Sequence, residues 1–239
     1  MKKLTPYVLS VCLLGFLSSC TLLRGDEVSP RGEETKEFSV SDFNEVDGGS
    51  AIYYTIKKGS TFNITAIGDE RDIDDLDIRV KGNRLKVDYV NRLGRIKRYR
   101  MDILIEMPTV EYVSFSGASD AVVKDFSGLS KLEVRLSGAS KLRIRQGIDK
   151  LTADVNGAST LFITDIINVL EANVSGASTV NAFEADATKA YVQASGASTV
   201  RVSVSDYLEV NASGASSVFY RGNPDIKEKT SGASKLKKD

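Results

Sequence analysis

The sequence predicts an all-β fold: a single-chain parallel β-helix, or β-solenoid, with about 18–21 residues in each coil. Three observations predict it. A Gly-Ala-Ser motif occurs seven times in the C-terminal half, with its glycines 18–21 residues apart. Apolar and polar residues alternate on both sides of each motif, as in strands that bury one face. A repeat of about 19 residues is also too short for a strand–helix–strand unit, which needs about 30.

The N-terminal residues 1–19 are expected to be a lipoprotein signal peptide. Two lysines follow Met1, residues 7–17 are mostly apolar, and small residues precede Cys20. This apolar run is shorter than the roughly 20 residues that a transmembrane helix needs. Leu-Ser-Ser-Cys resembles the lipobox of bacterial lipoproteins, which implies lipidation of Cys20 and a membrane anchor. The alternative is an ordinary cleaved leader with an incidental cysteine.

Residues 20–37 are expected to form the lipidated cysteine and a flexible tether, because they are rich in charge, Gly, Ser and Pro. The head domain is then 38–239. Its first part, 38–107, reads as degenerate coils with bends at Gly48 or Gly49 and at Gly82, and regular coils start at about residue 110. Charged residues in the last coil are expected to discourage another chain from pairing with the open end.

In the regular part, each glycine marks a corner between two strands. Before Gly138, for example, Val134 and Leu136 are predicted to point inward and Arg135 outward. Glycine recurs because every coil makes the same bend. Strict alternation would point the serine after Gly-Ala inward, whereas a bulge or a left-handed glycine would point the alanine inward, and the sequence leaves both open. The seven corner glycines are Gly117, Gly138, Gly157, Gly176, Gly196, Gly214 and Gly232.

The composition excludes several classes of function. The chain has no His and no Trp, so it has no imidazole base and no imidazole metal site. Its cysteines are Cys12 and Cys20, both in or at the end of the leader, so the domain has no disulfide or thiolate site. Lys plus Arg equal Asp plus Glu at 32 each, so no basic field is available for nucleic acid. We expect no metal and no cofactor.

One outward column is a candidate binding face, since it repeats amide and carboxylate groups at the coil spacing. Such a column could hold a glycan or the edge of an envelope protein. Polar residues face outward on every coil, however, and the interpretation we favour from the sequence is a structural ladder of stacked amides. An enzymatic alternative is a β-helix polysaccharide lyase or hydrolase. Such a site needs charged groups clustered on adjacent coils, but each column changes character along the array, so we expect no catalytic residues and no enzyme. The column is Asp154, Asn173, Gln193 and Asn211.

Taken together, the lipobox, the start Phe43-Asn-Glu-Val-Asp-Gly and the recurrent Ser-Gly-Ala-Ser resemble the autotransporter adhesin head domain family, of the GIN type. The resemblance runs from about Phe38 to Asp239. It implies an envelope protein with a β-solenoid head and without established catalytic residues. No translocating β-barrel follows Asp239, so a lipid anchor is expected in its place. The expected location is the bacterial outer membrane, with the head on the periplasmic or the external side.

Overall fold

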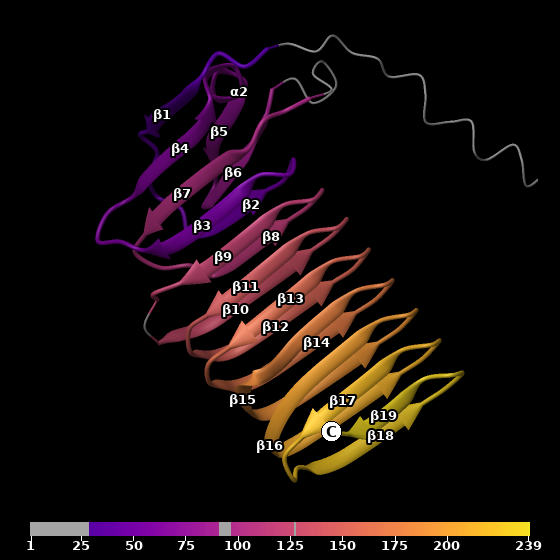
Figure 1. The fold of residues 1–239 in the computed structure, drawn as a ribbon. Coiled ribbons are helices and arrows are strands. Elements are labelled where there is room, and N and C mark those ends of the chain that lie inside the picture. Colours follow the sequence, from indigo (N-terminus) through magenta and orange to yellow (C-terminus); the bar gives the residue numbers. More distant parts are fainter. Residues whose placement is uncertain (1–28, 91–96, 127) are drawn as a thin grey trace, which may run out of the picture.

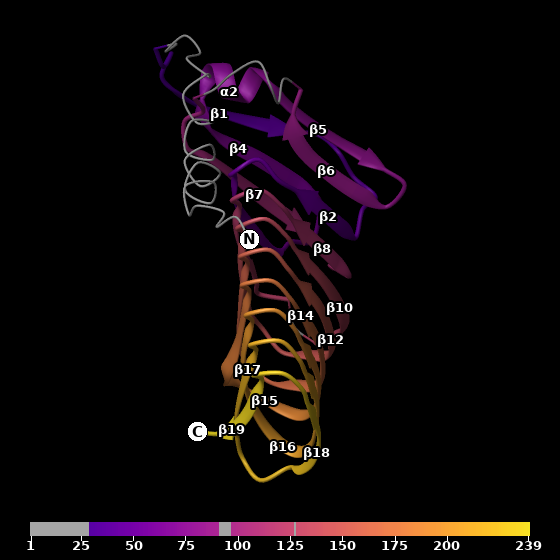
Figure 2. The same cartoon turned by 90° about the vertical axis from the view of Figure 1, so that its right-hand side faces the viewer.

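The computed structural model describes residues 29–90, 97–126 and 128–239. The chain winds as a flattened solenoid, so that two sheets face one another across an apolar core (Figures 1 and 2). Each regular coil contributes one strand to each sheet, and successive coils pair in parallel. The predicted β-solenoid is therefore confirmed.

We call the two layers sheet 1 and sheet 2. The strands β15 (Thr179–Ala194) and β16 (Thr199–Ala212) bend from sheet 2 into sheet 1 and so belong to both. In spatial order, sheet 1 otherwise contains β5 (Leu76–Lys81), β6 (Arg84–Tyr89), β2 (Glu45–Gly48), β8 (Tyr112–Phe115), β10 (Leu129–Leu136), β12 (Ile148–Val155), β14 (Ile167–Val174) and β18 (Asp225–Thr230). Sheet 2 contains β1 (Glu33–Phe38), β4 (Asn63–Asp69), β7 (Met101–Met107), β3 (Tyr53–Lys58), β9 (Asp120–Lys124), β11 (Lys141–Arg145), β13 (Thr160–Thr164), β17 (Ser217–Arg221) and β19 (Lys235–Lys238).

Equivalent side chains stack in register from coil to coil. Val134 pairs with Ala153, and Ala153 pairs in turn with Ala172. All the inward positions of the regular coils up to Val218 are buried, as the alternation predicted. Burying an aliphatic side chain stabilises a fold by about 1.5–3 kcal/mol, so these columns are the main source of stability.

At the corners, the structure places the serine inward and the alanine outward. The glycines have positive φ angles, +71° at Gly138, yet the serine keeps the inward position that strict alternation gives it, so the left-handed bend does not turn the alanine inward. Ser140 is 1% exposed, whereas Ala139 is exposed and donates its N–H to the Gly117 carbonyl at 2.7 Å. The Ser140 hydroxyl donates to the Ser137 carbonyl at 2.8 Å. The buried hydroxyl is thus satisfied by the corner's own backbone.

The N-terminal part differs from the predicted run of degenerate coils. β5 and β6 form an antiparallel hairpin around Gly82, and β4 is antiparallel to both β1 and β7. A short helix, α2 (Glu70–Asp74), follows β4. Together they cover the first end of the solenoid (Figure 1). The cap covers the edge strands and the apolar core at this end of the solenoid.

The first coil, β2–β3, also has a different corner. The position equivalent to Gly117 is occupied by Ser50, not by Gly48 or Gly49 as the sequence suggested, because Gly48 pairs with Phe115. Ser50 has a φ of 65° and donates its hydroxyl to Asp88 at 2.8 Å. This corner lies beside the cap, so it meets a different neighbour from the corners of the regular stack.

The strand order is not sequential. β2 lies between β6 and β8, and β3 lies between β7 and β9. The first coil of the sequence is therefore enclosed between a coil formed later, β6–β7, and the start of the regular array. This enclosure ties the cap to the solenoid by parallel pairing on both sheets.

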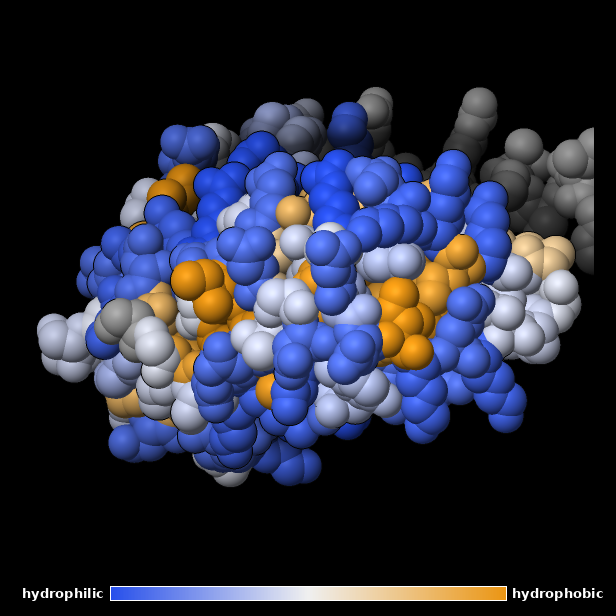
Figure 3. All heavy atoms as spheres, turned by 90° about the horizontal axis from the view of Figure 1, so that it is seen from below, coloured by the Kyte–Doolittle hydropathy of each residue, from blue (hydrophilic) through white to orange (hydrophobic). Residues whose placement is uncertain are grey.

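The two ends of the chain show further features. β1 starts at Glu33, so ordered structure begins inside the segment expected as a tether, because this segment pairs with β4. The other end is open, and all six residues of β18 are exposed. Figure 3, a view from that end, shows mostly hydrophilic side chains around a few apolar patches. None of the helices in the described ranges has the length and apolar character needed to traverse a bilayer.

Candidate binding groove

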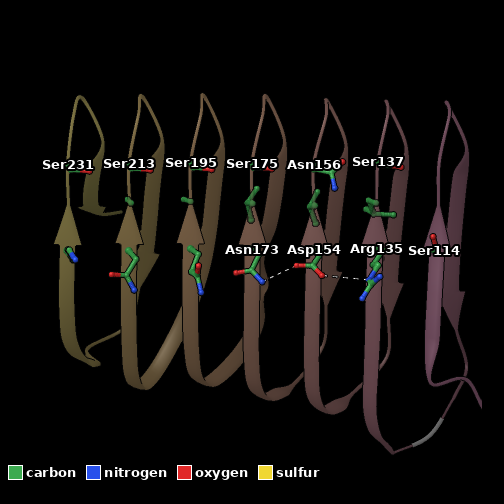
Figure 4. A pocket seen from close by; sticks show the side chains of 18 of the residues that line it. Ser114, Arg135, Ser137, Asp154, Asn156, Asn173, Ser175, Ser195, Ser213 and Ser231 are labelled. Atoms are coloured by element: carbon green, nitrogen blue, oxygen red, sulfur yellow. Dashed lines mark hydrogen bonds and ion pairs between the residues drawn. The ribbon is translucent and has the colours of Figure 1, made fainter.

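The outer surface of sheet 1 carries a long polar groove of about 970 Å³. It runs along the solenoid axis, because its lining comes from the same positions of successive coils (Figure 4). At about 4.8 Å per coil, a run from Ser114 to Lys229 extends over about 29 Å. The four predicted residues all line it: Asp154, Asn173, Gln193 and Asn211.

The predicted column contains both bonded and open groups. Asn173 donates an amide N–H to the Asp154 carboxylate at 3.0 Å, and Arg135 approaches the other oxygen of Asp154 at 3.8 Å. Farther along, Gln193 and Asn211 are exposed, and their side chains have no hydrogen-bond partner among the described residues. Part of the column is therefore a structural ladder, and part presents unused amide donors and acceptors.

A second polar column lines the groove nearer the corners, and the sequence analysis missed it. It is formed by the residue that precedes each corner glycine. At several corners the backbone carbonyl of this residue accepts from the buried serine; Ser213, for example, receives the Ser216 hydroxyl at 2.9 Å. The first serine of each Ser-Gly-Ala-Ser motif could have indicated this column, but the sequence analysis treated it as part of the corner. The lining residues of this column are Ser137, Asn156, Ser175, Ser195, Ser213 and Ser231 (Figure 4).

The charge of the groove is concentrated at its ends. Arg135 and Asp154 lie toward the first coils and Lys229 at the last, while amides and hydroxyls occupy the middle. Amides and hydroxyls both donate and accept hydrogen bonds, and none is a strong base or nucleophile. The described residues contain no cluster of His, Cys, Asp and Glu that could hold a metal ion. This arrangement is suited to binding a polar ligand.

A smaller depression of about 440 Å³ shares Tyr112 and Arg135 with the groove and is lined by several carboxylates. Lys131 forms an ion pair with Glu111 at 2.9 Å, and its hydrogen bond holds the pKa of the Glu111 carboxyl below its usual value. Arg84 forms a 2.6 Å ion pair with Glu45 and stacks on the ring of Tyr112 at 4.3 Å. These groups already hold one another, which is typical of a structural network.

The remaining predicted residues fall into two groups. The corner glycines form a stack: from Gly138 on, each lies against the glycine of the preceding coil, and Gly117 lies against Ser50. Cys20, the expected lipidation site, and the whole of 1–19 lie outside the described residues.

Solved structures share this fold. A putative adhesin from Bacteroides fragilis has a TM-score of 0.79 and 17% identity, covering 87% of this chain and 98% of that one. A putative lipid binding protein from Parabacteroides distasonis has a TM-score of 0.71 and 19% identity, over 89% and 99% of the two chains. A putative adhesin from Parabacteroides merdae has a TM-score of 0.71 and 16% identity, over 89% and 98%. At these identities the likeness shows the fold alone.

Comparison with curated proteins gives no match. A family model does match, over residues 42–224, and this range includes the first coil, most of the cap and nearly all the regular coils. Because the match covers well over half of the sequence, the chain belongs to the family described as "Putative auto-transporter adhesin, head GIN domain".

Proposed function

We propose that this protein is a non-catalytic, adhesin-like module that binds a glycan in the groove on sheet 1. The observation that carries the proposal is the groove itself, a continuous surface in which two columns of amides and hydroxyls repeat over successive coils. A glycan presents hydroxyl groups at a regular spacing along its length, so one polymer could form similar hydrogen bonds with several coils. Many such bonds give useful affinity even when each is weak.

The same geometry argues against the enzymatic alternative. Hydrolysis of a glycoside needs two carboxylates facing the same bond, one of them held protonated. Among the residues that line the groove, Asp154 is the one carboxylate, and it already contacts Arg135 and Asn173. The neighbouring carboxylates Glu111 and Glu171 are paired with Lys131 and Lys150.

Glycan binding is tested with the full-length protein in detergent on an array of neutral and acidic polysaccharides. Asn173→Ala and Gln193→Ala are expected to remove binding, because they delete amides in the centre of the groove. Thr199→Ala, on the outer face of sheet 2, is the matched control and is expected to bind normally. Absence of any bound glycan would show that the column is structural. Shortening of a bound polysaccharide would instead favour the enzyme.

We also propose that Cys20 carries the lipid that anchors the head to the bacterial outer membrane. The support is the lipobox-like sequence Leu-Ser-Ser-Cys at the end of an apolar leader. Several acyl chains give a stable anchor, at about 0.8 kcal/mol per buried methylene. Cells fed an alkyne-tagged fatty acid should label the wild-type protein and leave Cys20→Ser unlabelled. An unlabelled wild-type protein would contradict the anchor, and protease treatment of intact cells would show on which side the head lies.

A further inference from the structure

Two tyrosines form an aromatic pair on the outer surface of sheet 1. The ring centroids of Tyr191 and Tyr207 are 5.8 Å apart, and the ring planes are tilted by 54°. Tyr191 is 38% exposed, so a large part of its ring is open to solvent. The equivalent positions of the two preceding coils carry Thr152 and Glu171. The repeat itself therefore does not require an aromatic residue here.

The pair lies at the edge of the groove. Tyr191 is two residues before Gln193 on the same strand, so both side chains point outward and lie about 7 Å apart along the strand. In the next coil, Glu209 lies directly beside Tyr191, and Tyr207 is two residues before it. The aromatic surface therefore borders the part of the groove whose amides, Gln193 and Asn211, are unbonded.

Glu209 completes this border with a charged acceptor. It accepts the Tyr207 hydroxyl at 3.2 Å and the Lys227 ammonium at 3.1 Å. The hydrogen bond from Lys227 lowers the pKa of Glu209, so the carboxylate is ionised at neutral pH. A carboxylate has about four acceptor positions, so it can also accept from a ligand hydroxyl.

We infer that Tyr191 and Tyr207 form a stacking subsite for one neutral pyranose ring of a glycan, with Glu209 accepting one of its hydroxyls. The apolar C–H face of a sugar packs well on an aromatic ring, while its hydroxyls need polar partners at the ring's edge. The inference rests on the glycan binding proposed above and adds the class of sugar. A uronic acid is disfavoured at this subsite, because its carboxylate would lie beside that of Glu209, whose partner Lys227 is already engaged.

The probes are cellohexaose, mannohexaose and laminarihexaose, neutral β-linked hexasaccharides, titrated into the full-length protein in detergent by calorimetry. Tyr191→Ala is expected to weaken binding of the preferred probe by about tenfold, since it removes the stacking surface. Tyr191→Phe keeps the ring and should stay within about twofold of the wild type. Phe162→Ala, an outward aromatic on sheet 2, is the matched control and should leave the affinity unchanged. Circular dichroism checks that each variant is folded.

Saturation-transfer NMR gives a readout that a structural role would not produce. Irradiating the aromatic protons should transfer magnetisation most strongly to the ring C–H protons of one sugar, and Tyr191→Ala should remove this transfer. If Asn173→Ala abolishes binding while Tyr191→Ala leaves it unchanged, the aromatic subsite is overturned and the groove stands. If the wild type binds none of the neutral probes but binds polygalacturonate, the sugar class is overturned. If it binds neither, both proposals fall.

Discussion

At the scale of single residues, two factors favour glycine at the corners. Its φ angle is positive, and the backbone of the adjacent coil leaves no room for a Cβ atom. At Gly157, φ is +77°, and an added Cβ would lie 2.5 Å from the carbonyl oxygen of Gly138. Gly157→Ala is therefore expected to lower the free energy of unfolding by about 2–4 kcal/mol, through left-handed strain and a backbone clash. Urea denaturation followed by circular dichroism measures it.

Gly147 is the matched control for this prediction. It does not have a positive φ, and an added Cβ would meet the Ile166 carbonyl at an ordinary 3.7 Å. Gly147→Ala should therefore change the free energy of unfolding by less than about 1 kcal/mol. Equal destabilisation by the two substitutions would contradict the stacked-corner explanation.

The buried corner serines are expected to differ in their contribution to stability. The Ser216 hydroxyl donates to the carbonyls of Ser213 at 2.9 Å and Ala194 at 3.3 Å, whereas the Ser159 hydroxyl is buried without a partner among the described residues. Ser216→Ala should reduce the free energy of unfolding by about 1 kcal/mol, and Ser159→Ala by close to zero. Thermal unfolding of the two variants side by side measures the difference. A larger loss at Ser159 than at Ser216 would refute this reading of the hydroxyl column.

At the scale of elements, the cap depends on one cluster of charges. Arg98 donates to Asp72 and to Asp75, both at 3.0 Å, and stacks on the ring of Tyr89 at 3.7 Å; the backbone N–H of Tyr99 also donates to Asp72, at 2.8 Å. This cluster attaches α2 to the chain that leads into β7. The Asp72 side chain is 3% exposed, so its contacts are shielded from water.

Asp72→Ala is therefore expected to lower the free energy of unfolding by about 2–3 kcal/mol, because it leaves buried donors with fewer acceptors. The matched control on the same helix is Asp74→Ala, whose 3.8 Å ion pair with Lys36 is half exposed and should contribute less than about 0.5 kcal/mol. Hydrogen exchange should show faster opening of β4 and β7 in Asp72→Ala. Exchange that accelerates in the regular coils instead would show that the cluster does not act through the cap.

The strands of the regular array were predictable from the sequence because every coil has the same backbone bend and the same buried positions. A positive φ favours glycine, as at Gly138, and burial favours an aliphatic residue, as at Val134. Both residue types therefore recur at the spacing of the coils. The cap was not predictable in this way. The alternation in Leu76–Asp88 is the same for a hairpin as for a coil, because the direction of pairing is set by the partner strand. The corner at Ser50 was not predicted for a related reason, because on one side it contacts residues of the cap and not another regular coil.

The candidate groove was half predictable. Asp154 and Asn173 stood out as a polar column, because each lies between two apolar neighbours on its strand. The serine column beside them did not stand out, since Ser175 precedes a glycine and looked like part of the turn. Which amides stay unbonded depends on side-chain geometry between coils, and periodicity does not contain this information.

At the scale of the whole molecule, stability should be a sum over coils, because each regular coil pairs with its neighbours alone. Deleting residues 138–156 removes one whole coil and joins Ser137 to Gly157, so the corner sequence and both sheets stay in register and Asn173 is kept. The shortened protein is expected to unfold cooperatively, with a urea m-value lower by about a tenth. Deleting 138–147 alone joins two strands of sheet 1 without the intervening strand of sheet 2, and should abolish cooperative unfolding.

Glycan binding connects this modular architecture to function. If the ligand lies along the axis, its affinity should rise with oligosaccharide length and then level off when the groove is filled. The coil deletion shortens the groove by about 4.8 Å, so the plateau should come about one sugar earlier than in the intact protein. A length series measured by calorimetry on both proteins tests this. An unchanged plateau, with folding intact, would mean that the ligand crosses the strands instead of following the stack.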